Sequence, residues 1–414
     1  MRQRLLIGLL LAGAIMMSSG GVALASQSNA KVSYTVEAIN PSPGFGLDWT
    51  LGQRGFWDRI NSSGGVDGHQ INFTTCSDGT FVAQTQDLSA TCAEQAANSH
   101  VLAVVGSNSD YDAVVYPILS KAKIADVASF PDTITDDTSL ESTPFLTPTV
   151  VLEAGLGIEL KQLGHCTKVA FLDIAGASIT QANNDAFAAG AKWAGLKVAP
   201  PINLSATVSD YAPTVAILQG EGVDCVGDGL STEGNLPALL TAITDSGKQM
   251  KVDFVGVGVT PSQLMAIGPA ANNLLADVAG EEDALVNLVT PVKATAQERL
   301  MISDFGRASS AAAANGNLDM PGWLGADVLD IELKRLIAQH LPITSANVLV
   351  ALRQNYTITT GVMPPANFSS PGVIKGYNRI HNTDVNYIKI VDYAEQPNDY
   401  KLHSTAAALA KFKG

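Results

Sequence analysis

Short runs of apolar residues alternate with longer stretches of helical periodicity along most of the chain. Runs such as "VLAVVG" and "KVAFLDI" are mostly apolar and lack a polar residue at every second position. Such runs are typical of strands that are covered on both faces, as in parallel sheets flanked by helices. The pattern therefore predicts an α/β protein with parallel sheets.

This alternation of strand and helix occurs twice. The first round extends from "VSYTVEAI" to "IADVAS", and the pattern restarts with "KVAFLDI". The last quarter is different, because it holds the amphipathic helix "WLGADVLDIELKRLIAQH" and the alternating strand "NYIKIVDY". Two rounds in a chain of 414 residues predict two α/β lobes.

The stretch "DRINSSGGVDGHQINF", residues 58–73, joins a predicted helix to a predicted strand. A phosphate-binding loop would need a Lys and a Ser or Thr after its last glycine, at the start of a helix. Here Gly64 and Gly65 suit a left-handed helix stop, and Asp67 with Gly68 suits a tight turn. We interpret the stretch as a structural corner. The helix before it carries on one face Trp49, Phe56, Trp57 and Ile60.

The loops that follow the predicted strands share one composition. Right-handed crossovers place such loops at one edge of each sheet, where open α/β sheets bind their ligands. The loops contain hydroxyls, amides and glycines, and no lysine or arginine. They are "NPSPGFG", "GSNSDYD", "ASFPDT", "IAGASIT", "GDGLSTEGN" and "GVTPSQ". Because phosphates and dicarboxylates usually recruit Arg, this composition disfavours multiply charged anions as ligands.

In "GSNSDYD", Ser109 or a neighbouring polar residue can cap the helix that follows. The free backbone N–H groups of that helix start could hold an anion or a carboxylate. The alternative is a capped helix with nothing bound.

The first 25 residues have the form of a secretory signal peptide. Two arginines precede an apolar run from Leu5 to Met17, and Ala23-Leu24-Ala25 matches a small-x-small cleavage site. A membrane anchor would need about 20 apolar residues. We therefore expect cleavage near Ala25 and export to the periplasm or the extracellular space.

The chain is acidic, with a formal net charge of −14. Loss of Arg2 and Arg4 with the signal peptide makes the mature chain more acidic still. This charge argues against nucleic acid and anionic membrane surfaces as partners.

The chain contains four cysteines, and an even number in an exported protein suggests disulfides. Three connectivities are open. The local one, Cys76–Cys92 with Cys166–Cys225, places one bridge in each predicted lobe, and buried free thiols are the alternative. The sequence has no C-x-x-C motif, which argues against thiol redox chemistry.

Motifs for catalysis are incomplete. In "GLSTEG" the second glycine comes one residue too late for a nucleophile elbow, and "GVGVTP" lacks the third glycine of a dinucleotide-binding loop. None of the six histidines lies within four residues of another. We therefore expect no enzyme activity, no cofactor and no metal site. The alternative is an exported enzyme with Asp110, Asp228 or Glu233 as acid and base.

Three stretches resemble a known family. "GFWDRINSSGGVDGHQINF" resembles the helix, corner and strand near the start of the periplasmic leucine/isoleucine/valine-binding proteins, the type I substrate-binding proteins of ABC transporters. "VLAVVGSNSDYDAVVYPIL" is similar to that family's strand and binding loop. "KVAFLDIAGASI" with "AFAAGAKWAGLKV" resembles the start of its second lobe. The likeness extends from about Tyr34 to about Tyr393.

The resemblance implies two Rossmann-like lobes with parallel sheets, joined by three crossovers, with the ligand between them. The first crossover would lie at 145–150 and the second at 285–292. The N-terminal lobe would comprise 26–148, completed by about 290–365. The C-terminal lobe would comprise 149–289, completed by about 366–414.

The family's binding positions carry over to a set of loop residues. These are Phe45, Asn108, Ser109, Asp110, Tyr111, Ser129, Phe130, Ser178, Thr180, Ser231 and Thr232. Two features depart from the amino-acid binders: the "GASIT" loop has no aromatic residue, and the acidic residue expected near Gly258 is missing. Asp228, Glu233 or Asp110 would have to replace that acid.

The resemblance implies a solute-binding protein that closes around its ligand by hinge motion and delivers it to a membrane ABC permease. The composition of the loops favours a small, largely apolar organic ligand with one or two polar groups, such as an amino acid, an amide or an aromatic acid. A sensor that signals to a receptor and a lobe pair that binds only protein are the alternatives. We expect the protein to be a monomer.

Overall fold

The structure is a computed structural model, and it describes residues 33–42, 50–80, 83–175, 179–205, 207–229, 235–255, 265–279, 294–308, 316–392, 394–399, 401–410 and 412. Val32–Gly414 forms one compact unit. The predicted signal peptide, residues 1–25, lies outside the described residues.

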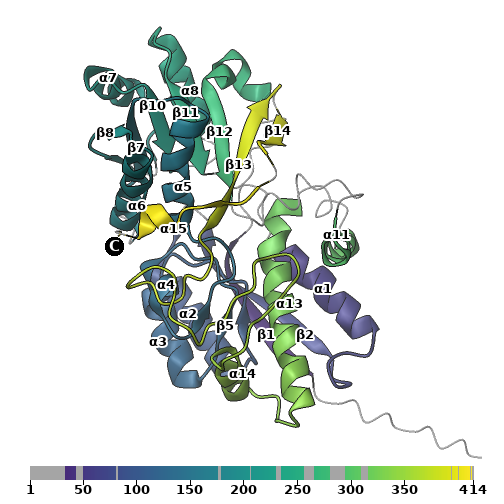
Figure 1. The fold of residues 1–414 in the computed structure, drawn as a ribbon. Coiled ribbons are helices and arrows are strands. Elements are labelled where there is room, and N and C mark those ends of the chain that lie inside the picture. The colour runs from purple at the N-terminus through teal and green to yellow at the C-terminus, as the bar shows by residue number, and fades with distance from the viewer. Residues whose placement is uncertain are drawn as a thin grey trace, which may run out of the picture. The chain divides into compact units, whose positions relative to one another are not determined.

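The first sheet has six strands in the order β3-β2-β1-β4-β5-β6. Of these, β1, β2 and β5 are labelled in Figure 1. Neighbouring strands are parallel, except that β3 runs antiparallel to β2. The strands are β1 Tyr34–Ser42, β2 Ile71–Thr80, β3 Ala83–Gln84, β4 Val104–Val105, β5 Asp126–Val127 and β6 Ser142–Thr143. The predicted strands around residues 104 and 126 are confirmed but short, since only two residues of each are paired as strand.

Helices cover both faces of this sheet. Successive strand residues point to opposite faces, so Val105 joins one hydrophobic core with Trp57 and Trp323, whereas Val104 joins another with Leu119. The helices are α1 Thr50–Ser62, α2 Gln86–Asn98, α3 Asp112–Ala122, α4 Ile134–Thr138, α11 Ala296–Ala308, α13 Gly316–Ala338 and α14 Ser345–Leu352. Two separate cores on one sheet confirm the predicted layering of helices on both faces.

The second sheet has nine strands and follows the order β14-β13-β12-β11-β10-β7-β8, with β9 paired to β7 and β15 to β13. Strands β7 to β12 pair in parallel, and β13 and β14 add an antiparallel edge. The strands are β7 Lys168–Ile174, β8 Lys197–Val198, β9 Ile202–Leu204, β10 Cys225–Asp228, β11 Lys251–Val255, β12 Leu274–Ala279, β13 Asp384–Val391, β14 Ala394–Pro397 and β15 His403–Ser404. The prediction of parallel sheets therefore holds for the centre of this sheet but not for its late-sequence edge.

The helices of the second sheet also form two layers. Val169 and Phe171 of β7 enter the core shared with α5 and α6, whereas Ala170 and Leu172 enter the core shared with α7 and α8. The bounds are α5 Thr149–Gln162, α6 Thr180–Trp193, α7 Ala212–Gly220, α8 Asn235–Asp245, the 3-10 helix η1 Gly268–Asn273 and α15 Ala406–Leu409.

The chain passes between the two sheets more than once. It leaves the first sheet after β6 and enters the second lobe with α5, and after β12 it returns with α11, which packs on α1. It reaches the second sheet again with β13. The predicted first crossover, 145–150, falls in the passage from β6 to α5. The predicted second crossover, 285–292, lies outside the described residues. The lobe boundaries stay predictions.

The corner at residues 58–73 has the predicted conformation. Gly64 and Gly65 have φ of +104° and +76°, and Asp67 and Gly68 have φ of 50° and 76°. A Cβ on Gly65 would lie 2.0 Å from the carbonyl oxygen of His69, so glycine is required there. On the preceding helix Phe56, Trp57 and Ile60 are buried as expected, and Trp49 lies outside the described residues.

Helices α5 and α6 approach closely at glycines. A Cβ on Gly190 would lie 2.0 Å from the carbonyl oxygen of Ala154, and a Cβ on Gly157 would lie 2.5 Å from that of Phe187. We expect Gly190→Ala to lower the free energy of unfolding by about 2 kcal/mol, because the helices must separate. Urea denaturation measures this. Gly220→Ala is the control, since a Cβ at this end of α7 meets no atom within 4 Å. Equal stability of the two variants would refute the close approach.

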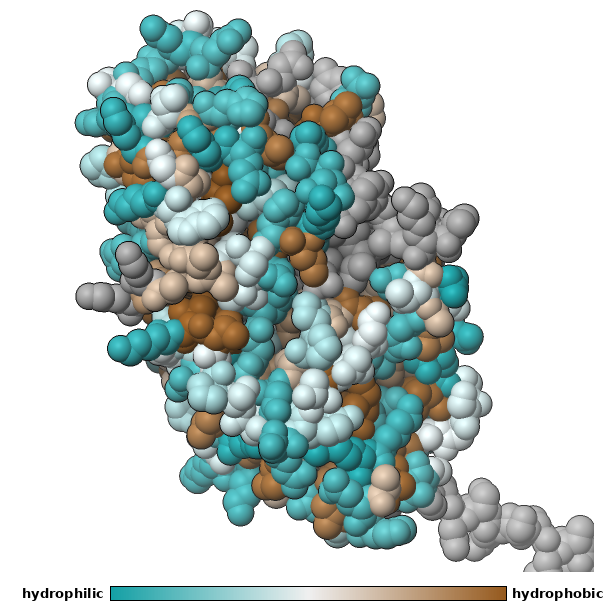
Figure 2. Space-filling view, in the orientation of Figure 1, coloured by the Kyte–Doolittle hydropathy of each residue, from teal (hydrophilic) through white to brown (hydrophobic). Residues whose placement is uncertain are grey.

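The surface is mixed. The face in Figure 2 shows hydrophobic residues in small groups among hydrophilic ones. Within the described part of the chain, the helices are too short or too polar to cross a membrane.

Candidate functional site

The predicted binding loops of the first lobe meet at the carboxyl ends of β1, β4 and β5. The backbone N–H of Asn108 donates to the Ile39 carbonyl at 3.0 Å, and that of Phe130 donates to the Ser107 carbonyl at 2.8 Å. Asn108, Ser109 and Ser129 are buried, Tyr111 and Phe130 are half-buried, and Asp110 is exposed. The structure therefore brings the described first-lobe members of the predicted set together at one sheet edge.

Ser109 does not cap the following helix. Helix α3 begins at Asp112, and its N-cap residue, Tyr111, makes no side-chain capping bond. The Ser109 hydroxyl instead donates to Ser89 at 3.1 Å and accepts from the Tyr111 N–H at 3.3 Å. The capping expectation was wrong because Ser109 lies too far before the helix to reach its first turn.

The Ser109 hydroxyl continues into a buried acidic network. Ser89 donates to Asp78 at 3.1 Å, and the Asp110 N–H donates to the Gln84 side chain at 2.7 Å. Burial raises the pKa of Asp78, against the effect of its serine hydrogen bonds. Desolvation of the carboxyl and the charge of Asp78 raise the pKa of Asp110 to about 6. The carboxyls at this edge therefore keep their protons to a higher pH than ordinary aspartates do.

Two buried amides beside this network have no partner. Asn40 lies two residues before the end of β1 and Asn108 follows β4, and their exposed fractions are 5% and 1%. Neither the oxygen nor the nitrogen of either side chain finds a hydrogen bond among the described residues. A buried polar group without a partner costs about 1–3 kcal/mol. Sequence reasoning did not select Asn40, although its position near the end of an apolar strand is the signal that could have found it.

The second sheet also ends in buried polar groups. Asp173 ends the buried part of β7 and accepts from the Ile174 N–H at 2.8 Å, while Thr180 donates to the Ile174 carbonyl at 2.7 Å. Burial raises the pKa of Asp173 to about 7. Burial, together with the charges of Asp173 and Asp228, raises the pKa of Glu153 well above its ordinary value. With a pKa of about 7, Asp173 is partly protonated at neutral pH and can then donate a hydrogen bond. Glu153 and Asp173 were not predicted.

Four members of the predicted set lie outside the described residues: Phe45, Ser178, Ser231 and Thr232. The same holds for Glu233 and for the position near Gly258 where the family's acid was expected. Of the acids that could replace it, Asp228 is fully buried at the end of β10, and Asp110 belongs to the first lobe. The full set of binding residues stays a prediction.

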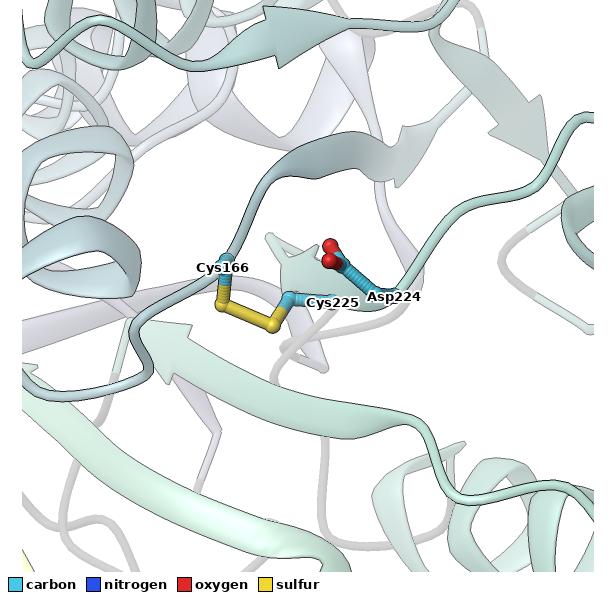
Figure 3. Close-up of side chains that lie close together, drawn as sticks. All are labelled: Cys166, Asp224 and Cys225. Carbon is cyan, nitrogen blue, oxygen red and sulfur yellow. A yellow bond between two sulfur atoms is a disulfide. The ribbon is translucent and has the colours of Figure 1, made fainter.

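The cysteines form the predicted local pairs. Cys76–Cys92 joins β2 to α2, with a Cα–Cα distance of 5.5 Å. Cys166–Cys225 joins the segment just before β7 to the first residue of β10, with a Cα–Cα distance of 6.0 Å. Asp224 lies beside the second bridge (Figure 3) and accepts hydrogen bonds from the N–H groups of Thr167 and Lys168. Because both sulfurs are in the disulfide, this cluster offers no thiolate to a metal.

A surface groove of about 700 Å³ lies between α7 and α8. Its walls include Val215, Ala238 and Gln219, with Asp210 and Asp245 among the acidic residues. None of the predicted binding residues lines it. We therefore do not assign the ligand site there.

A family model for periplasmic binding proteins matches residues 41–373. No curated protein matches the chain in sequence. Its structure is similar to a fatty acid ABC transporter substrate-binding protein from Thermomonospora curvata, with a TM-score of 0.72 and 16% identity over 91% of this chain and 94% of that one.

Two further structures have the same fold. One is an ABC transporter solute-binding protein from R. palustris in complex with 4-hydroxybenzoate, with a TM-score of 0.69 and 15% identity over 90% of this chain and 97% of that one. The other is the leucine-, isoleucine-, valine-, threonine- and alanine-binding protein from Brucella ovis, with a TM-score of 0.68 and 12% identity over 92% of this chain and 97% of that one. These neighbours are ligand-binding components of transporters or amino-acid-binding proteins. The chain therefore belongs to the periplasmic binding protein family and has the type I fold of the Leu/Ile/Val-binding-like substrate-binding proteins of ABC transporters.

Proposed function

We propose that this protein is exported and captures a small organic molecule between the carboxyl edges of its two sheets, and that it delivers this molecule to an ABC permease by hinge closure. The observation that carries the proposal is the pair of buried, unpartnered amides of Asn40 and Asn108. A ligand that supplies their hydrogen bonds would remove a cost that the ligand-free protein bears.

The chemistry of the two edges indicates the class of ligand. An amide offers both a donor and an acceptor, and the carboxyls of Asp173 and Glu153, whose pKa values burial raises, offer donors when they carry their protons. Half-buried Tyr111 and Phe130 add apolar surface to the first edge. A mostly apolar molecule with one carboxylate, carbonyl or amide fits these groups. The neighbours described above include a fatty acid transporter component and a 4-hydroxybenzoate complex, which agree with this class.

A thermal-shift screen of the chain from Ser26 onward tests the proposal. The library should hold amino acids, amides, aromatic acids and fatty acids, with phosphates and dicarboxylates as the disfavoured class. A ligand at 100 times its Kd should add about 2.7 kcal/mol to the free energy of unfolding. No shift across the library, or shifts with phosphates and dicarboxylates alone, would contradict the proposal.

The variant Asn108→Leu separates binding from folding. It removes an unpartnered amide at nearly constant volume, so we expect the ligand-free variant to be at least as stable as the natural chain. Its response to the ligand should be lost. Asn98→Leu, at the exposed end of α2, is the matched control and should keep the response. An Asn108→Leu protein that binds the ligand normally would show that the amide does not face it.

A further inference from the structure

Three carboxylates converge inside the first lobe. Oxygen atoms of Asp112, Asp132 and Asp136 all lie within 4.8 Å of one another. Asp112 is the first residue of α3, Asp136 belongs to α4, and Asp132 lies in the segment between β5 and α4. Asp112 and Asp136 have exposed fractions of 2% and 1%, so solvent does not screen them from each other.

Positive side chains do not neutralise this group. Among the described residues, no lysine, arginine or histidine forms an ion pair with any of the three aspartates. The backbone N–H of buried Arg379 donates to the carbonyl of Asp137 in α4. Its guanidinium, however, donates to the carbonyls of Ser142 and Phe368. Buried charges need a partner or a metal ion, and like charges this close cannot all stay ionised alone.

A fourth, fully buried carboxyl, that of Asp126, lies close to this group. One of its oxygens accepts from the Ser107 hydroxyl and lies 3.4 Å from the Tyr116 hydroxyl, which donates to Asp136. The other oxygen of Asp126 has no partner among the described residues, and the same is true of one buried oxygen of Asp132. These oxygens have acceptor capacity that the protein does not use.

The donor set is made of hard oxygens. The aspartates are joined by the hydroxyl of Ser142, which donates to Asp136 at 3.0 Å, and by Ser129, 3.0 Å from Ser142. Ca²⁺ prefers carboxylate and other oxygen ligands in a flexible arrangement, whereas Zn²⁺ sites generally include His or Cys. Neither His nor Cys belongs to this cluster.

We propose that the first lobe holds a hard divalent cation of the calcium type between the carboxylates of Asp112, Asp132 and Asp136. The cation would bind the start of α3 to the segment before α4. These two segments directly follow the loops of Ser109 and Ser129, so the cation would also stiffen the proposed ligand edge. That last consequence rests on the proposed function, but the cation site itself does not.

The test uses the chain from Ser26 onward after treatment with a chelator. Titration with Ca²⁺, followed by calorimetry and by thermal melting at constant ionic strength, should show one equivalent bound and a rise in Tm. Terbium gives an independent readout: excited tyrosine should sensitise its luminescence, because the Tyr116 hydroxyl contacts Asp136. Added Ca²⁺ should then quench this signal by displacement.

Asp136→Asn should weaken Ca²⁺ binding by at least about tenfold. Asp58→Asn, on the exposed side of α1, is the matched control and should bind as the natural chain does. The competing explanation is that protons neutralise the cluster. Melting that ignores both Ca²⁺ and chelator at neutral pH, with Tm rising only as the pH falls, would overturn the proposal. Titration of the natural chain decides this even if the Asp136 variant fails to fold.

Discussion

Replacing Cys166 and Cys225 together by alanine is expected to lower the free energy of unfolding by about 4 kcal/mol. The bridge closes a loop with a sequence separation of 59, and its removal enlarges the conformational freedom of the unfolded chain. Both cysteines are buried in the second-lobe core with Phe171 and Phe187, so lost packing acts in the same direction. Urea denaturation without reductant measures the effect.

The first-lobe bridge is the matched control. Cys76–Cys92 has a sequence separation of only 16, so its double alanine variant should lose about 3 kcal/mol, roughly 1 kcal/mol less than the second-lobe variant. If the order of the two losses were reversed, loop length would not be the deciding factor. Intact mass after alkylation without reductant should show no modified cysteine in the natural chain.

Arg379→Ala is expected to lower the free energy of unfolding by about 3–5 kcal/mol. The Arg379 side chain is 2% exposed, and its guanidinium donates to the Ser142 carbonyl at 2.7 Å and the Phe368 carbonyl at 3.0 Å. It also lies 4.9 Å from the ring centroid of Phe368. Alanine would leave both carbonyls without donors and a cavity in place of the side chain.

The charge of Arg379 does not change this expectation. Burial lowers its pKa to about 10, so the guanidinium still carries its proton near neutral pH. The arginine joins Ser142, just before the first passage to the second lobe, to the segment that leads into β13. Its loss should therefore loosen the connections between the lobes as well as destabilise the fold.

Arg54→Ala provides the control, because Arg54 also lies over an aromatic ring, that of Phe73, but is exposed. Its loss should cost less than about 1 kcal/mol. Urea denaturation of both variants at neutral pH is the measurement. Similar losses for the two variants would mean that the buried hydrogen bonds of Arg379 contribute little.

The sequence by itself determined the features that depend on local pattern. Apolar runs separated by helical periodicity indicated two α/β lobes, and the strand "KVAFLDI" was located to the residue as β7. Gly64 and Gly65 indicated a corner, because few other residues adopt positive φ. The local pairing of the cysteines was also the correct one. The first two of these signals lie within short stretches of chain, and the cysteine pairing follows from choosing the pairs nearest in sequence.

Only the tertiary structure decided which polar residues are buried without partners. Asn40, Glu153 and Asp173 each have at least one buried side-chain atom without a partner among the described residues. In the sequence they look like ordinary polar residues, because the same letter stands for a solvated and a buried side chain. Asp112 and Asp132 are 20 positions apart, and they meet only because β4 and β5 are neighbours in the sheet. Arg379 donates a hydrogen bond to the Ser142 carbonyl, although the two residues are separated by more than half of the sequence. Such contacts depend on how elements pack, whereas periodicity records only which face each element buries.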